Sequence, residues 1–233
     1  MKTVGFIGAY DKTDLNIYIA RILTAIGKKV LVIDATTLQK AKYVVPAISN
    51  AKAYVTNFED IDIAVGFYNV PSIKAYMGMP EHASFDYDYI FLDIDMPECI
   101  KIFGIPTATK NYFVSGFDAY SLKRGMEILA PIEEPILLKK VLFSRNITKE
   151  EDDYLNYISL GAKVMWDEEK IYFPFEQGDQ TTIMENQRVE KIKLKKLTPL
   201  YKESLQYLVT DIMENDSEGV NLRKVFKQLE KGV

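Results

Sequence analysis

The sequence has almost no cysteine or histidine: Cys99 and His82 are the single residues of each type among 233. One cysteine excludes an internal disulfide, so we expect a reducing compartment such as the cytoplasm. A zinc cluster is excluded as well, because structural zinc takes about four cysteine and histidine ligands. A serine or cysteine nucleophile would need His82 as its base. We interpret His82, which lies in the polar segment "MPEHASFD", as a loop residue.

Long apolar runs and a strong charge excess are also absent. No stretch approaches the roughly 18 apolar residues of a membrane span, and "MKTVGFIG" lacks the features of a signal peptide. The formal net charge of -4 at pH 7 gives no reason to expect nucleic acid as a whole-surface partner. Hydrophobic residues at 48% and charged residues at 27% are typical of a soluble globular protein.

Apolar runs of strand length alternate with helical patterns along the chain. The runs cover residues 3–9, 29–34, 61–67, 89–94, 111–117, 139–144, 162–166 and 171–175, and the helical patterns cover 13–27, 118–129, 148–159 and 198–213. Several runs are continuously apolar, as in strands that helices bury on both faces. We therefore predict an α/β fold over residues 1–213, a single doubly wound, mostly parallel sheet of about seven or eight strands with helices on both faces. A polar break, "ENDSEG", then separates this domain from an amphipathic segment, so that 214–233 form a second unit.

The loop "GAYDKTD" follows the first predicted strand, at the edge of the sheet where such folds bind ligands. Lys12 is placed to reach phosphate oxygens, and the Thr13 hydroxyl to bind Mg²⁺. Gly8 lies close to the first glycine of a phosphate-binding loop, but Asp11 stands where a second glycine is needed. A carboxylate about 4 Å from a phosphate costs roughly 4 kcal/mol at an effective dielectric constant near 20. The loop alone therefore fits either a phosphate-binding loop or an ordinary strand-to-helix turn.

The loop is one part of a pattern of four segments that extends over nearly the whole chain, from Met1 to Met213. They are "GFIGAYDKTDLNIYIARILTAIGKKVLVIDA", "FDYDYIFLDID", "YFVSGFDAYSLKRGMEIL" and "IYFPFEQGDQTTIMENQRVEKIKLKKLTPLYKESLQYLVTDIM". In this order and spacing they resemble the ParA/MinD family of deviant P-loop ATPases. The resemblance implies a site for ATP and Mg²⁺, with Thr13 and Asp93 supporting the metal. The implied nucleotide-binding residues are Gly8, Asp11, Lys12, Thr13, Asp34, Asp93 and Pro174.

The sequence also departs from the family pattern. The signature lysine is Ile7, the second aspartate of the D-x-D pair is Thr36, and the asparagine that often reads adenine is Ser144, with Asn146 two residues on. These losses remove several positioning and electrostatic contributions to phosphoryl transfer. We therefore predict a degenerate ParA/MinD-like pseudo-ATPase with weak or absent hydrolysis. It would act as a positioning or assembly scaffold for pilus, secretion, conjugation or plasmid machinery; the alternative is an active ATPase of the family with an unusual loop.

The resemblance has implications for partners too. It implies a homodimer across the nucleotide edge of the sheet and a protein partner in a larger assembly. Because the signature lysine is missing, side-chain packing would have to hold the dimer together. The basic stretch "RVEKIKLKKL" (188–197) is interpreted as a solvated face rather than a DNA-binding patch.

The C-terminal segment has an apolar stripe at helical spacing, with basic residues on its other faces. The stripe consists of Leu222, Val225, Phe226 and Leu229. It resembles the amphipathic helix by which MinD-type proteins rest on the inner membrane, and such a stripe would meet a membrane or a partner. The other interpretation is a final helix packed on the body. We therefore expect the protein in the cytoplasm, either free or peripheral at the inner face of the membrane.

Overall fold

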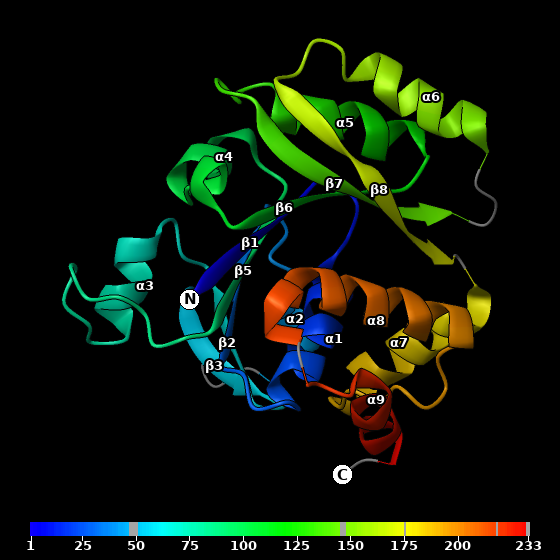
Figure 1. Cartoon of the computed structure of the whole chain (residues 1–233). Helices are drawn as coiled ribbons and strands as arrows, with labels where there is room; N and C mark the ends of the chain where they lie inside the picture. The colour runs from blue at the N-terminus through cyan, green and yellow to red at the C-terminus, as the bar shows by residue number, and fades with distance from the viewer. Residues whose placement is uncertain (47–50, 145–147, 175, 218, 232–233) are drawn as a thin grey trace.

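A computed structural model of the chain describes residues 1–46, 51–144, 148–174, 176–217 and 219–231 (Figure 1). Asn146, the alternative adenine-contacting residue of the sequence analysis, lies outside the described residues.

Eight strands form one sheet within the described part of the chain. In the order in which they pair, they are β3 (Tyr54–Phe58), β4 (Ile61–Val65), β2 (Val30–Ala35), β5 (Tyr89–Ile94), β1 (Lys2–Ile7), β6 (Lys110–Ser115), β7 (Ile136–Ser144) and β8 (Val164–Pro174). β3 runs antiparallel to β4, and the other pairs are parallel. The prediction of a single, mostly parallel sheet is confirmed.

The structure corrects two details of the predicted strands. The apolar runs at 162–166 and 171–175 belong to one strand, β8, because the ladder with β7 resumes at the Lys140–Lys170 pair after a register shift next to Leu138.

β3 was not predicted at all. It joins β4 through Glu59 and Asp60, whose φ angles are 52° and 65°. Glycine or asparagine is the usual signal for such a turn, and neither stands at these two positions.

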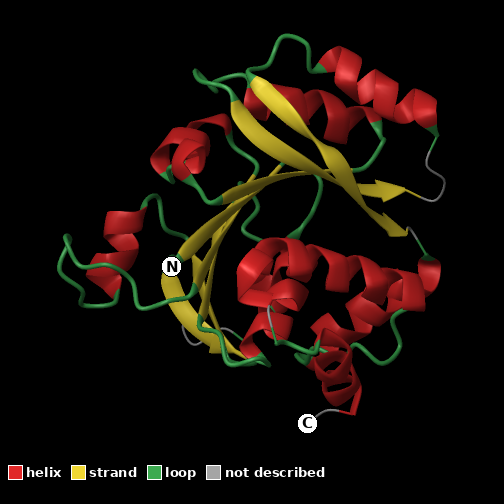
Figure 2. Cartoon of the chain, viewed as in Figure 1, coloured by secondary structure: helices red, strands yellow, loops and turns green. Residues whose placement is uncertain are grey.

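Helices cover both faces of the sheet (Figure 2). One face carries α1 (Thr13–Thr24), α2 (Ala41–Val44), α7 (Gln177–Val189), α8 (Pro199–Met213) and α9 (Leu222–Lys231), and the other carries α3 (Val70–Tyr76), α4 (Pro97–Ile102), α5 (Ala119–Leu129) and α6 (Lys149–Ile158). A 3-10 turn, η2 (Glu214–Ser217), separates α8 from α9. No described helix is long and apolar enough to cross a membrane.

The central strands and the first helix show why this sequence forms three layers. β2 and β5 are buried at every residue, as expected for parallel strands covered on both faces. α1 presents Leu15, Ile19 and Ile22 to the core, a stripe at helical spacing. The carboxyl ends of β1, β2 and β5 therefore meet the N-terminus of α1 at one edge of the sheet.

Candidate functional site

The loop after β1 turns sharply at Gly8. Gly8 has a φ of 143°, and a Cβ atom there would lie 2.2 Å from the Val114 carbonyl oxygen. Only glycine fits this backbone. The loop then reaches Lys12 and enters α1 at Thr13. On the neighbouring strands, Asp34 of β2 and Asp93 of β5 are paired in register, so both aspartates lie at this edge of the sheet.

The Lys12 ammonium group is held inside the protein. Lys12 is 2% exposed. Its Nζ lies 2.7 Å from Asp93 Oδ1 and donates a hydrogen bond to the Gly8 carbonyl oxygen at 2.8 Å. The other Asp93 oxygen accepts from Asn16 Nδ2 at 3.0 Å. Burial raises the pKa of Asp93 to about 7, although the Lys12 charge lowers it, and Asp34 raises it further. The charge that would meet a phosphate is therefore already paired with a carboxylate of the chain.

A second carboxylate lies at the N-terminus of α1. Asp11 Oδ1 accepts from the Thr13 N–H at 3.2 Å, and Oδ2 accepts from Lys40 Nζ at 2.6 Å. Burial alone would raise the pKa of Asp11, but the bonds from Lys40 and Thr13 outweigh it and lower the pKa. A helix N-terminus attracts anions, and here the anion belongs to the protein. Lys40 was not foreseen, because it comes from the segment after β2.

Asp34 has a structural role in this arrangement. Its Oδ1 accepts from the Thr36 N–H at 3.0 Å and from the Thr36 hydroxyl at 2.6 Å, and its Oδ2 accepts from the Ala41 N–H at 3.0 Å. Asp34 thus caps the turn after β2 and the start of α2. Burial raises its pKa, and the three bonds partly offset that rise.

These residues as arranged do not fit Mg²⁺ or a triphosphate. The hollow next to Lys12 has a volume of about 70 Å³, whereas ligand pockets usually measure about 300–1,000 Å³. A cation at Thr13 and Asp93 would have to displace the Lys12 ammonium. Among the described residues there is no group of three or more histidine, cysteine, aspartate or glutamate side chains that could hold a metal ion.

Comparison with known proteins gives a clear result only for structure. No protein-family model and no curated protein matches the sequence. A ParA family ATPase from Chlorobium tepidum TLS superposes with a TM-score of 0.58 at 13% identity, covering 88% of this chain and 96% of that one. MinD in the MinC:MinD cell division complex of Aquifex aeolicus superposes with a TM-score of 0.56 at 16% identity, covering 89% of this chain and 95% of that one. A point variant of Cyanothece McdA in complex with ATP superposes with a TM-score of 0.56 at 14% identity, covering 91% of this chain and 96% of that one.

This chain has the ParA/MinD fold of P-loop NTPases. At these identities the likeness shows the fold, and the site must be judged from its own residues. Ile7, aligned with the signature lysine in the sequence analysis, is fully buried in the core between the sheet and α4 and α5. Thr36, aligned there with the second aspartate, is 8% exposed and bonded to Asp34. Pro174, expected near the base, ends β8 and lines a larger cavity beside the loop.

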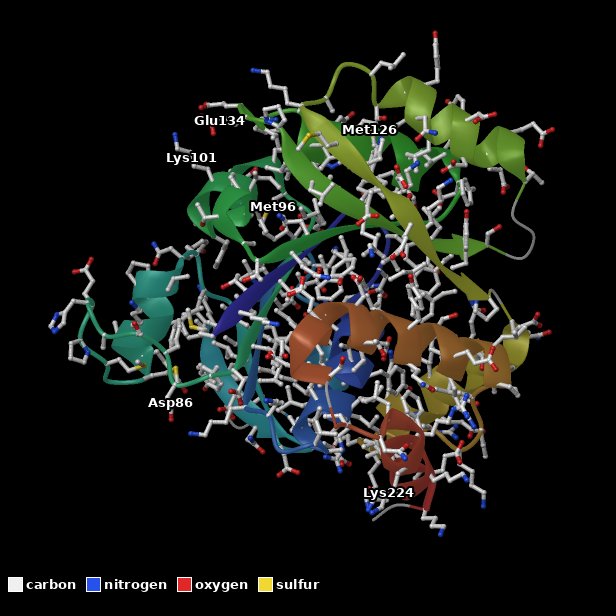
Figure 3. The ribbon with its side chains drawn as sticks, in the orientation of Figure 1. Asp86, Met96, Lys101, Met126, Glu134 and Lys224 are labelled. Carbon is white, nitrogen blue, oxygen red and sulfur yellow. The ribbon has the colours of Figure 1, made fainter. Side chains whose placement is uncertain are left out.

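The four stripe residues of the C-terminal segment lie away from this edge. Leu222, Val225, Phe226 and Leu229 are buried and join the core formed by α1 and α8. Their helix, α9, is tied to α8 by an ion pair between Lys202 and Glu230. Lys224 lies on the outer side of α9 (Figure 3). In this structure the helix packs on the body, and a role at a membrane or partner would require it to detach.

Proposed function

We propose that this protein is a degenerate ParA/MinD-like scaffold that positions a partner and turns over little or no ATP. One observation carries the proposal: the two cationic features of a phosphate site, Lys12 and the N-terminus of α1, are both satisfied by carboxylates of the chain. A triphosphate would have to displace Asp93 from one and Asp11 from the other.

Electrostatics supports the same conclusion. At about 4 Å and an effective dielectric constant near 20, each uncompensated carboxylate–phosphate contact costs roughly 4 kcal/mol. The hollow beside Lys12 is lined by Asp11, Asp93 and Asp95 against Lys12 and Lys40. Nucleotide binding therefore needs the loop to rearrange, and hydrolysis would also lack the water-orienting acid that Thr36 replaces.

The scaffold part of the proposal rests on the fold and its known uses. MinD, with the same fold, has been solved in complex with MinC, so this sheet and its helices can present a surface to a protein partner. We extend this to the present chain as a homodimer that binds a protein within a larger assembly. The Cyanothece McdA variant holds ATP on the same fold, and binding of Mg·ATP without turnover is compatible with the proposal if Asp11 moves aside.

The test is phosphate release from Mg·ATP by the full chain and by three variants. We expect no turnover above background for the wild type, Lys12→Ala and Thr13→Ala. Asp11→Gly removes the internal anion and should gain nucleotide affinity, seen as thermal stabilisation by ATP. Thr13→Ala is the matched control, because it leaves the Lys12–Asp93 ion pair intact. Robust turnover by the wild type that is lost in both Lys12→Ala and Thr13→Ala would overturn the proposal in favour of an active ATPase.

A further inference from the structure

A second cavity opens beside the first loop, between the start of α1 and the face of α7. Its volume is about 360 Å³, at the lower end of the range of about 300–1,000 Å³ for small-molecule sites. Pro174, at the end of β8, and Ile183, on α7, form part of its apolar lining. The proposed scaffold function makes no use of this cavity.

Aromatic rings form one wall of the cavity. Tyr10 and Phe143, both lining residues, stack with centroids 4.6 Å apart and planes inclined by 20°. Phe143 stacks in turn on Phe173 at 5.0 Å, which meets the edge of Tyr201 at 5.1 Å. These rings give the cavity an apolar wall against which a carbon frame can pack.

The charged lining residues are all acidic. They are Asp11, Asp14, Glu176 and Asp179, and among the described residues no lysine, arginine or histidine lines the cavity. Asp11 is paired with Lys40, and Asp179 accepts from the Thr198 N–H and hydroxyl. Asp14 and Glu176 have no ion pair within the part of the chain that the structure describes. Asp14 accepts one side-chain bond, from Gln187 Nε2 at 2.8 Å.

A buried phenol without a partner completes the site. Tyr201 lines the cavity and is 3% exposed, yet no hydrogen bond to its hydroxyl occurs within the described residues. Burial, the Tyr18 phenol and the Asp14 carboxylate all raise the pKa of this hydroxyl well above its ordinary value, so it stays protonated and can donate a hydrogen bond. The hydroxyl is not among the fully buried polar atoms that lack a partner in the described part of the chain, so it is accessible from the cavity, where a ligand can hydrogen-bond to it.

We propose that this cavity binds an organic cation, an ammonium or guanidinium group on a slim carbon frame. The carboxylate of Asp14 would accept from the cation, the Tyr10 and Phe143 rings would contact its stem, and Glu176 would attract it at the rim. The cation can come from a free small molecule or from a lysine or arginine side chain of a bound protein. A nucleoside triphosphate is disfavoured here by the same carboxylates.

Calorimetric titration of the full chain tests this with a matched pair of probes. n-Butylguanidinium should bind, and n-butylurea, its neutral isostere, should bind at least about tenfold more weakly, because charged hydrogen bonds contribute about 1.5–3 kcal/mol. Asp14→Asn and Glu176→Gln should each weaken binding of the cation. Tyr201→Phe should weaken it without lowering the stability of the free protein, since the hydroxyl has no partner to lose.

Two further probes identify the source of the cation. Spermidine represents free polyamines, and the peptide acetyl-Gly-Arg-Gly-amide represents a side chain of a partner. Binding of either that is lost in Asp14→Asn supports the proposal and shows which source fits. Equal binding of n-butylurea and n-butylguanidinium would overturn it. So would the absence of binding by all three cations, or binding that Asp14→Asn and Glu176→Gln leave unchanged. ATP turnover plays no part in this experiment, so its outcome is independent of the proposed function.

Discussion

At the scale of single residues, the charged side chains of the first loop are paired within the protein: Lys12 with Asp93 and Asp11 with Lys40. Lys12 is therefore a structural residue. Lys12→Ala leaves Asp93 buried without its ion-pair partner. Breaking a buried pair in this way typically costs about 3–5 kcal/mol. We therefore expect Lys12→Ala to lower the free energy of unfolding by several kcal/mol, measured by urea denaturation.

A double variant separates this effect from simple loss of packing. Asp93→Asn in the Lys12→Ala background removes the stranded charge and should recover much of the lost stability. If Lys12→Ala is as stable as the wild type, Lys12 does not hold Asp93 in solution, and its ammonium is free to bind an anion.

The pH dependence of stability should report the unpaired carboxylate of Asp14. Burial raises its pKa from 3.8 to about 6, although the bond from Gln187 lowers it. The folded state therefore binds this proton more tightly than the unfolded state. The ionised carboxylate destabilises the folded state, and this destabilisation is absent below pH 3.8 and complete above about pH 6. At 1.36 kcal/mol per pKa unit, Asp14→Asn should stabilise the protein above pH 7 by up to about 3 kcal/mol.

The measurement is the unfolding free energy of both proteins across this range. The two curves should converge at acidic pH, where Asp14 of the wild type is protonated. The amide introduced by Asp14→Asn keeps an oxygen that can accept from Gln187, so no hydrogen bond should be lost. A constant offset at every pH would show that the titration of Asp14 is not the cause.

At the scale of elements, α9 is the part whose position decides between two roles. Phe226 is buried against the body, so Phe226→Ala should destabilise the protein by about 3–5 kcal/mol in thermal or urea unfolding. Lys227→Ala, at an exposed position of the same helix, is the control and should have little effect. A membrane-bound α9 would instead make Phe226→Ala neutral to folding and would make the full chain, but not a chain ending at Ser217, sediment with anionic vesicles.

The elements also show how far the sequence alone could lead. β2 and β5 were predictable because their apolar runs are continuous. Lys12 and Thr13 could be placed at this edge of the sheet because their loop joins a strand to a helix, whereas Asp93 was placed there only by the resemblance to the ParA/MinD family. α7 was missed because its start has no side-chain cap and its end has Glu190 in the left-handed region, φ 50°, in place of glycine. Lys40 could not be assigned to the first loop, nor Tyr201 to the cavity beside it, since only the folded chain brings such distant segments together.

At the scale of the whole molecule, the edge of the sheet that holds the first loop also exposes large apolar side chains. Leu38 follows β2, Tyr68 follows β4, and Tyr120 lies in the first turn of α5 after β6. They are 66%, 86% and 68% exposed. The carboxyl ends of these parallel strands lie at the same edge. Exposed apolar side chains spaced along one edge can contribute to a surface that another chain covers.

We therefore predict a homodimer held at this edge by side-chain packing, with an interface well above about 1,000 Å². Tyr68→Asp and Leu38→Asp would each place a charge in that interface, where it loses hydration without gaining a partner. Both variants should shift the protein toward the monomer in sedimentation equilibrium. A loss of about 1.4 kcal/mol of association free energy would raise the dissociation constant of the dimer tenfold, and we expect at least this change. Tyr157→Asp is the control, because Tyr157 is 70% exposed on α6 and should leave association unchanged. A wild type that is monomeric at every concentration would rule out the dimer, and dissociation by Tyr157→Asp alone would move the interface to α6.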